Sequence, residues 1–120
     1  MKEDNDNLIA VESKALAIRC IKLYQHLTEN KREFVLCKQL LRSGTSIGAN
    51  VKEALRRQSK ADFGTKMNIA LKEASESEYW LELLFETDYL STEGFESMME
   101  DCKRIIRILT AIVKSTFQGR

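Results

Sequence analysis

Apolar residues recur every three to four positions along four stretches of the chain, and polar residues fill most positions between them. This spacing places the apolar side chains on one side of a helix. The pattern predicts helices at about residues 8–28, 33–57, 60–87 and 92–117. The connecting stretches are short, so consecutive helices are expected to pack antiparallel. We therefore predict an all-α fold: one domain over residues 1–120, built as an antiparallel up-and-down four-helix bundle.

The second stretch carries two neighbouring apolar stripes instead of one. Phe34 opens the first stripe, and Gly44 and Gly48 follow on it, four residues apart. Each glycine costs a helix interior about 0.5–1 kcal/mol relative to alanine, so close approach by a neighbouring helix is the expected compensation. Membrane helix dimers share this glycine spacing, but nearby lysines and arginines leave no apolar run that could cross a bilayer. The glycines thus predict tight packing inside a soluble bundle, with no membrane partner.

Polar residues mark the starts of three predicted helices. Asn7 is a candidate cap for the first helix. Ser59, followed by Asp62 three residues later, resembles a capping box at the start of the third, and Ser91 is the candidate cap of the fourth. Side-chain oxygens at these positions accept hydrogen bonds from backbone N–H groups that have no partner within the helix.

The composition favours long helices in a reducing compartment. The chain has 43% hydrophobic residues and no proline, so it has few helix breakers. Cys20, Cys37 and Cys102 lie at core spacings and are odd in number, which predicts buried thiols. The polar, acidic beginning of the sequence does not resemble a signal peptide, so we expect a cytoplasmic protein. No Cys-x-x-Cys pair is present and His26 is the only histidine, so no metal or other cofactor is expected.

The charges are unevenly distributed, although the formal net charge is only +1. Residues 73–101 contain ten acidic residues and no lysine or arginine, whereas a basic cluster precedes them. The candidate nucleic-acid-binding residues of this cluster are Lys52, Arg56, Arg57, Lys60 and Lys66. Cations around a tight turn can hold phosphates, although cations at a helix C-terminus are also favoured by the helix dipole alone. No known recognition motif accompanies them, so contacts mostly to backbone phosphates are expected.

A polar set lies among the inward-facing positions of the second and third helices. Its members are Arg42, Ser43, Ser46, Asn50, Glu53 and Glu78. We interpret it as a hydrogen-bond network that sets the register of the two helices, with Arg42 or Asn50 as candidate partners for Glu78. The enzyme alternative makes Glu53 and Glu78 an acid–base pair with Arg42 as an anion clamp. Because no nucleophile–base pair, metal motif or phosphate loop accompanies the set, no catalytic residue is predicted.

Part of the third helix is apolar outside its core stripe. The residues concerned are Ile69, Tyr79, Trp80 and Leu83, and we predict that they form an interface between copies of the chain. The acidic side chains of Glu82, Glu86 and Glu96 provide an alternative docking face for a protein partner.

Three stretches carry a resemblance to a known family: R-S-G-T-S-I-G-A-N at 42–50, S-K-A-D-F at 59–63 and I-A-L-K-E-A-S-E-S-E at 69–78. They resemble the bacterial four-helix bundle proteins associated with 23S rRNA intervening sequences, and the resemblance covers nearly the whole chain. The run Lys-Glu-Ala at 52–54 departs from the Ala-Glu-Gly of many relatives. A more distant resemblance is to the accessory protein of diversity-generating retroelements.

The resemblance implies a ring-like homo-oligomer, commonly a pentamer, without known catalytic activity. We therefore predict a non-enzymatic bacterial protein that binds RNA or another nucleic acid through its basic surface. The alternative is a protein-interaction scaffold or accessory subunit, for example to a reverse transcriptase, with no direct nucleic-acid contact.

Overall fold

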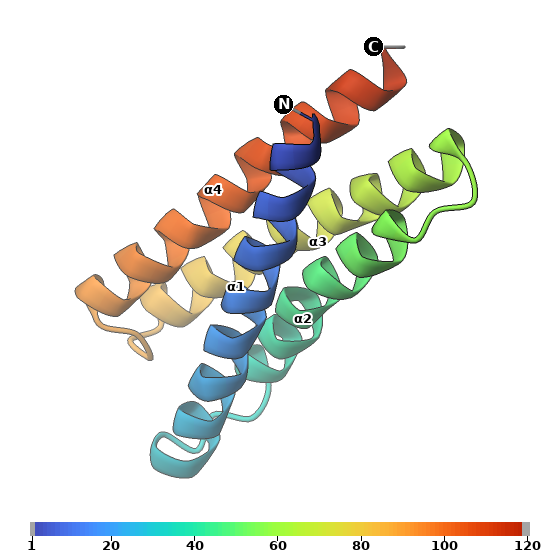
Figure 1. Ribbon diagram of the computed structural model, residues 1–120. Coiled ribbons are helices and arrows are strands. Elements are labelled where there is room, and N and C mark those ends of the chain that lie inside the picture. Colours follow the sequence, from blue (N-terminus) through green and yellow to red (C-terminus); the bar gives the residue numbers. More distant parts are fainter. Residues whose placement is uncertain (1, 119–120) are drawn as a thin grey trace.

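The computed structural model describes residues 2–118, which form four helices and no strand. These are α1 (Lys2–Asn30), α2 (Leu36–Leu55), α3 (Lys60–Glu86) and α4 (Thr92–Phe117). Helices α1 and α3 each pack against α2 and α4, which gives an up-and-down bundle measuring 46 × 22 × 18 Å. Figure 1 shows α1 crossing in front of the bundle and the beginning of α1 near the end of α4.

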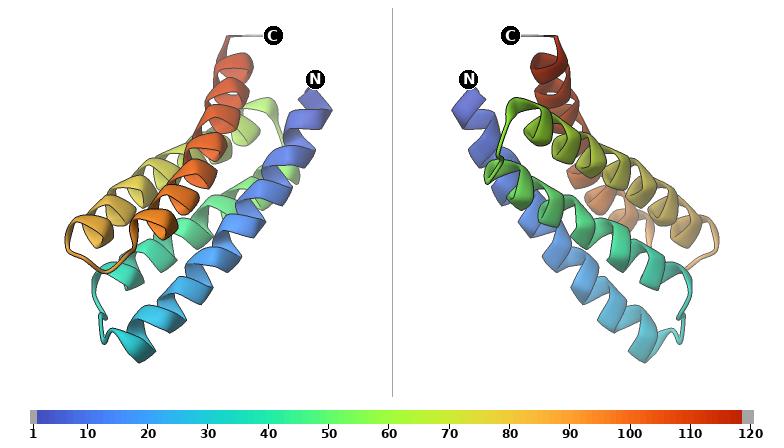
Figure 2. Two further views of the ribbon diagram at one scale, coloured as in Figure 1. Left: turned by 90° about the vertical axis from the view of Figure 1, so that its left-hand side faces the viewer. Right: turned by 90° about the vertical axis from the view of Figure 1, so that its right-hand side faces the viewer.

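The connections lie at the two ends of this elongated bundle. The α2–α3 turn lies at the end where α1 begins and α4 finishes, and the α1–α2 and α3–α4 connections lie at the other end (Figure 2). No helix within residues 2–118 is long and apolar enough to span a bilayer. The predicted all-α bundle is confirmed.

The core consists mainly of side chains from the predicted apolar stripes. Leu16, Ile47, Leu81 and Leu109, one from each helix, are at most 1% exposed. All three cysteines are buried and free, as expected. Burial raises the pKa of each thiol to about 12, and for Cys37 the adjacent Glu33 side chain raises it as well.

Two helix starts follow the predicted capping chemistry. The Ser59 hydroxyl accepts a hydrogen bond from the Asp62 N–H at 3.0 Å, and the Ser91 hydroxyl accepts one from the Gly94 N–H at 3.0 Å. The cap predicted at Asn7 is wrong, because α1 already begins at Lys2. The polar residues before Leu8 show no apolar periodicity, but they include neither glycine nor proline, so nothing stops the helix there.

The start of α2 also differs from the prediction, and Glu33 is the reason. Its carboxylate lies before the helix and accepts hydrogen bonds from the N–H groups of Val35, Leu36 and Cys37 at 2.9, 2.8 and 2.7 Å. These are N–H groups that the first turn of a helix leaves unpaired. The helix therefore begins at Leu36. Phe34, predicted on the inner stripe, instead lies in the connection and is 51% exposed.

The two glycines of α2 face α1. A Cβ atom added to Gly44 would lie 2.4 Å from the Cys20 Sγ atom, far inside van der Waals contact. A Cβ atom added to Gly48 would lie 3.5 Å from the Ser13 Oγ atom, which is an ordinary contact. The predicted close approach is confirmed, and it is tightest at Gly44.

Candidate nucleic-acid interface

The α2–α3 turn gathers four of the predicted cations at one end of the bundle. The last turn of α2 tightens, because the N–H groups of Arg56 and Arg57 each donate at 3.1 Å to the carbonyl three residues earlier. Helix α3 then begins at Lys60. The short connection keeps Lys52, Arg56, Arg57 and Lys60 close along the chain, and all four side chains are exposed.

These four cations have no acidic partner among the residues that the structure describes, because the ion pairs within residues 2–118 involve other side chains. The Arg57 guanidinium lies 4.8 Å from the centroid of the buried Phe63 ring. Such a cation–π contact orients the guanidinium while leaving its charge intact. The turn thus presents positive charge that an external anion can use.

Lys66 differs from the other four. Its Nζ atom lies 2.9 Å from the Glu53 Oε1 atom, which links α3 to α2. The hydrogen bond and the negative charge of Glu53 raise the pKa of Lys66. Its charge is therefore already paired, and of the five predicted cations it is the one least available to a phosphate.

A groove of about 560 Å³ between α1 and α2 adds a cation that sequence reasoning missed. Lys14 lines it together with Lys52 and Arg56, and small residues such as Gly48 and Ala49 form much of the remaining lining. Lys14 lies far from the basic cluster in sequence. The sequence indicates this groove only through the small residues Ala10, Ser13 and Ala17, which flank Lys14 at the spacing of one helix face.

The predicted partners of Glu78 are wrong. The Arg42 side chain forms ion pairs across the α2–α3 contact with Glu73, at 3.4 Å, and with Glu76. The Asn50 side chain donates to the carbonyl of Ser46 on its own helix at 2.9 Å. Glu78 is half-buried and forms neither of these contacts. The position of Glu78 among apolar residues in the sequence indicated a buried side chain, but the side chain is only partly buried.

The remaining members of the polar set do not form one network. The hydroxyls of Ser43 and Ser77 lie 2.8 Å apart in the core and join α2 to α3. The Ser46 hydroxyl donates to a carbonyl within α2, and Glu53 pairs with Lys66 near the turn. By helix rise, residue 78 lies about 18 Å along α3 from residue 66. The arrangement therefore sets register through separate links and does not place Glu53 beside Glu78.

The side chains predicted to form an interface on α3 are less exposed than expected. Tyr79 is 53% exposed, but Ile69, Trp80 and Leu83 are half-buried, and Trp80 packs against the core. The Trp80 Nε1–H donates to the Glu76 Oε1 atom at 3.2 Å, and the Tyr79 ring lies 5.2 Å away at a tilted angle.

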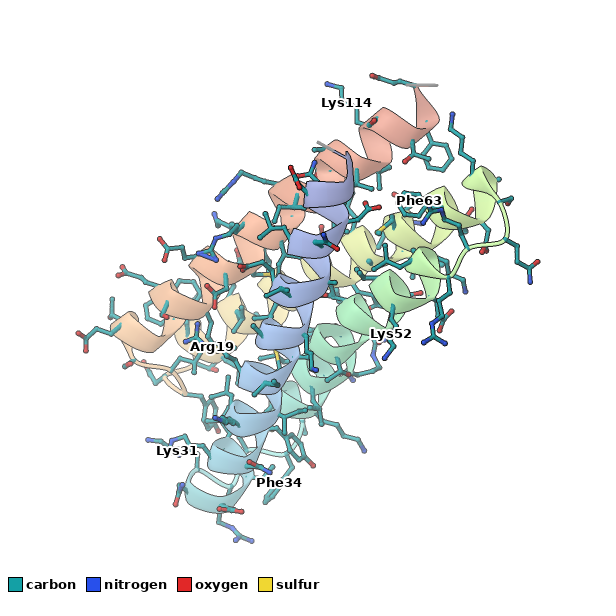
Figure 3. All side chains as sticks on the ribbon, viewed as in Figure 1. Arg19, Lys31, Phe34, Lys52, Phe63 and Lys114 are labelled. Carbon is teal, nitrogen blue, oxygen red and sulfur yellow. The ribbon has the colours of Figure 1, made fainter. Side chains whose placement is uncertain are left out.

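Other large apolar side chains are exposed on a surface that the sequence did not indicate. They belong to α1 and the α1–α2 connection. Those residues are Leu8, Val11, Ile18, Ile21, Phe34 and Val35. Figure 3 shows Phe34 at the opposite end of the molecule from Phe63. Residues 2–118 bring together no group of three or more histidine, cysteine or acidic side chains that could hold a metal ion.

Comparison with known proteins places this chain among similar sequences and structures. The family model described as 23S rRNA-intervening sequence protein matches residues 5–111. The structure is similar to the crystal structure of a protein with unknown function from the S23 ribosomal protein family of Bacteroides thetaiotaomicron, with a TM-score of 0.90 and 51% sequence identity. That match covers 92% of this chain and 98% of the other. No curated protein matches significantly.

Proposed function

Because the chain belongs to the 23S rRNA-intervening sequence protein family, we propose that it is a non-enzymatic cytoplasmic protein that binds RNA or another nucleic acid through the α2–α3 turn. The observation that carries this proposal is a set of four exposed cations at that turn that form no ion pair within residues 2–118: Lys52, Arg56, Arg57 and Lys60.

The chemistry of these side chains suits a phosphate backbone. Arginine offers a planar fork of N–H donors that matches two phosphate oxygens, and lysine adds a point charge. No known recognition motif accompanies these side chains in the sequence, so we expect contacts to backbone phosphates and not to base edges. We therefore expect binding with little sequence preference and with affinity that falls steeply as salt rises.

The separation of positive and negative charge along the bundle favours phosphate binding at the end that carries the α2–α3 turn. The α3–α4 connection contains Asp88 and is flanked by Glu86 at the end of α3 and Glu93 at the start of α4, and it lies at the opposite end from the α2–α3 turn (Figure 2). Repulsion between these carboxylates and a phosphate at the turn is weakened by distance and by salt screening.

The test is the binding of a fluorescently labelled, structured ribosomal RNA fragment, followed by anisotropy over a range of salt. The double variant Arg57→Glu/Lys60→Glu is expected to weaken binding about tenfold or more. The slope of log affinity against log salt concentration should also decrease, by about two phosphate contacts. The matched control is Lys103→Glu/Arg107→Glu, which makes the same change in net charge on exposed residues of α4. Equal weakening by both variants, or no binding by the wild type at low salt, would contradict the proposal.

We also propose that copies of the chain associate, with the pentamer implied by the resemblance as the expected state. The exposed apolar side chains of α1 and of Tyr79 support association, because exposed apolar surface of this kind is typical of interfaces. Light-scattering mass tests it.

The second candidate function is a scaffold or accessory subunit for a protein partner such as a reverse transcriptase. The observation that favours it is the exposure of Glu82, Glu86 and Glu96, which form no ion pair within residues 2–118. If RNA fails to bind while the mass shows an oligomer, this candidate becomes the better one.

A further inference from the structure

The α1 side of the bundle is incompletely covered. Of the eight large apolar side chains that are exposed among the described residues, six lie on α1 or the α1–α2 connection, and Val11 is 65% exposed. Apolar surface left in water forgoes the stabilisation that its burial would give. Concentration of such surface on one helix indicates that another molecule covers it.

The groove beside this stripe restricts what can cover it. Small residues make up much of its lining, together with Val51 and Leu55, and they leave a groove of about 560 Å³ between α1 and α2. Lys14, Lys52 and Arg56 lie around it, and none of the three forms an ion pair within residues 2–118. A complementary occupant is therefore an apolar ridge flanked by carboxylates.

This chain carries such a ridge on α3. Tyr79 projects from the outer side of the helix with its ring against Trp80, and Leu83 follows one turn later. Glu82 and Glu86 are exposed beside them and pair with no cation within residues 2–118. The ridge thus combines aromatic and aliphatic surface with unpaired negative charge.

The two surfaces do not meet within one molecule, because the groove needs α1 as well as α2, α3 packs on α2 without contacting α1, and Tyr79 is 53% exposed. Two grooves cannot face each other favourably either, since Lys14 and Lys52 of both copies would then repel. The arrangement that pairs opposite charges places the ridge of one copy, with Glu82 and Glu86, in the cationic groove of the next. A head-to-tail contact of this kind joins unlike surfaces and can close into a ring.

We propose that the α3 ridge (Tyr79, Trp80, Leu83, Glu82 and Glu86) of one copy docks in the α1–α2 groove of the next copy. The proposal rests on the self-association proposed above and names its two surfaces and its head-to-tail sense. Lys52 and Arg56 line the groove, so in the assembled protein they bind carboxylates of the neighbouring copy and leave phosphate binding to the other two cations of the α2–α3 turn. Arg57 and Lys60, which do not line the groove, stay available to phosphates.

The experiment uses one variant on each surface. Ala49 lies in α2, is exposed and lines the groove, so Ala49→Arg places a long side chain in the groove without disfavouring the helix. Tyr79→Arg places a cation on the ridge. Each is expected to weaken association on the order of a hundredfold, which gives monomers of 13.8 kDa by light scattering. The control Ala111→Arg, at an exposed position of α4, is expected to keep the wild-type mass. Circular dichroism verifies that each variant stays helical.

Mixing the two variants tests the head-to-tail sense. Ala49→Arg retains an intact ridge and Tyr79→Arg an intact groove, so an equimolar mixture is expected to form a dimer that stops growing at one contact. Unchanged mass in either variant, or a mixture that stays monomeric at a concentration where the wild type is fully assembled, would overturn the proposal while leaving self-association standing. A monomeric wild type would overturn both. RNA binding by Arg57→Glu/Lys60→Glu is judged separately, because neither residue lines the groove.

Discussion

At the scale of single residues, the two glycines of α2 have different roles although both face α1 and lie four residues apart. Gly44 lies opposite the buried Cys20, whose thiol has little room to turn away. Gly48 lies opposite Ser13 at an ordinary contact distance. Only Gly44 is therefore required for the close approach of α1 to α2, whereas Gly48 leaves space that contributes to the groove.

Gly44→Ala is expected to destabilise the protein by about 1–3 kcal/mol, because the new methyl group overlaps the Cys20 thiol. Gly48→Ala, the matched control, is expected to be neutral or to stabilise by up to about 1 kcal/mol through helix propensity. Urea unfolding measures both. In a Cys20→Ala background the cost of Gly44→Ala should largely disappear; a cost that persists there would assign it to something other than this overlap.

At the scale of elements, the beginning of α2 depends on a side chain outside the helix. Burial alone would raise the pKa of Glu33, but hydrogen bonds from the N–H groups of Cys37, Leu36 and Val35 hold it below its usual range. A carboxylate at a helix N-terminus also interacts favourably with the helix dipole. The folded chain thus stabilises the ionised carboxylate of Glu33 more than the unfolded chain does.

Glu33 is expected to contribute to acid sensitivity. Because its folded pKa is depressed, its stabilisation is complete above the unfolded glutamate pKa of about 4.3 and is lost as pH falls through the folded pKa. Glu33→Gln should cost about 1–2 kcal/mol at neutral pH and reduce the loss of stability in acid. Urea midpoints between neutral and acidic pH measure this, with the exposed Glu29→Gln as control. Parallel pH curves for wild type and Glu33→Gln would contradict it.

At the scale of the whole molecule, the surfaces that carry the two proposals are distributed over different parts of an elongated bundle. The free cations lie around the α2–α3 turn, and the groove runs between α1 and α2. The acidic ridge lies on α3, diagonal to α1. A monomer with one cationic groove and one acidic ridge on separate helices has unlike surfaces to offer to two neighbours.

Trp80, the only tryptophan, is expected to report on the proposed assembly through its fluorescence. It is half-buried in the monomer, and docking of the ridge in a groove would remove more water from it. Dilution of the wild-type protein through dissociation should therefore shift its fluorescence to longer wavelength, and Trp80→Ala should lower the oligomer mass without loss of helicity. Tyr79→Arg should show the dissociated spectrum at every concentration. Emission that stays constant while the mass falls would place Trp80 outside the interface.

Local signals predicted much of the fold and one candidate site. Ser59 and Ser91 indicated helix starts because capping is a contact over three residues. Arg56 and Arg57 indicated a basic turn because they are adjacent in the chain. Signals failed where the partner is distant: Arg42 pairs with Glu73 and Glu76, not Glu78, because the register of α2 against α3 selects the partner.

By itself, the sequence determined the helices, their core stripes, the antiparallel order and the basic turn, because periodicity, caps and short connections act within a few residues. Only the tertiary structure decided that Lys14 and Lys52 line the same groove and that Lys66 forms an ion pair with Glu53. It also decided that Val11 and Ile18 remain exposed on α1. These outcomes depend on which sides of two helices face each other and how closely. Packing of side chains far apart in sequence sets that geometry, and no local pattern encodes it.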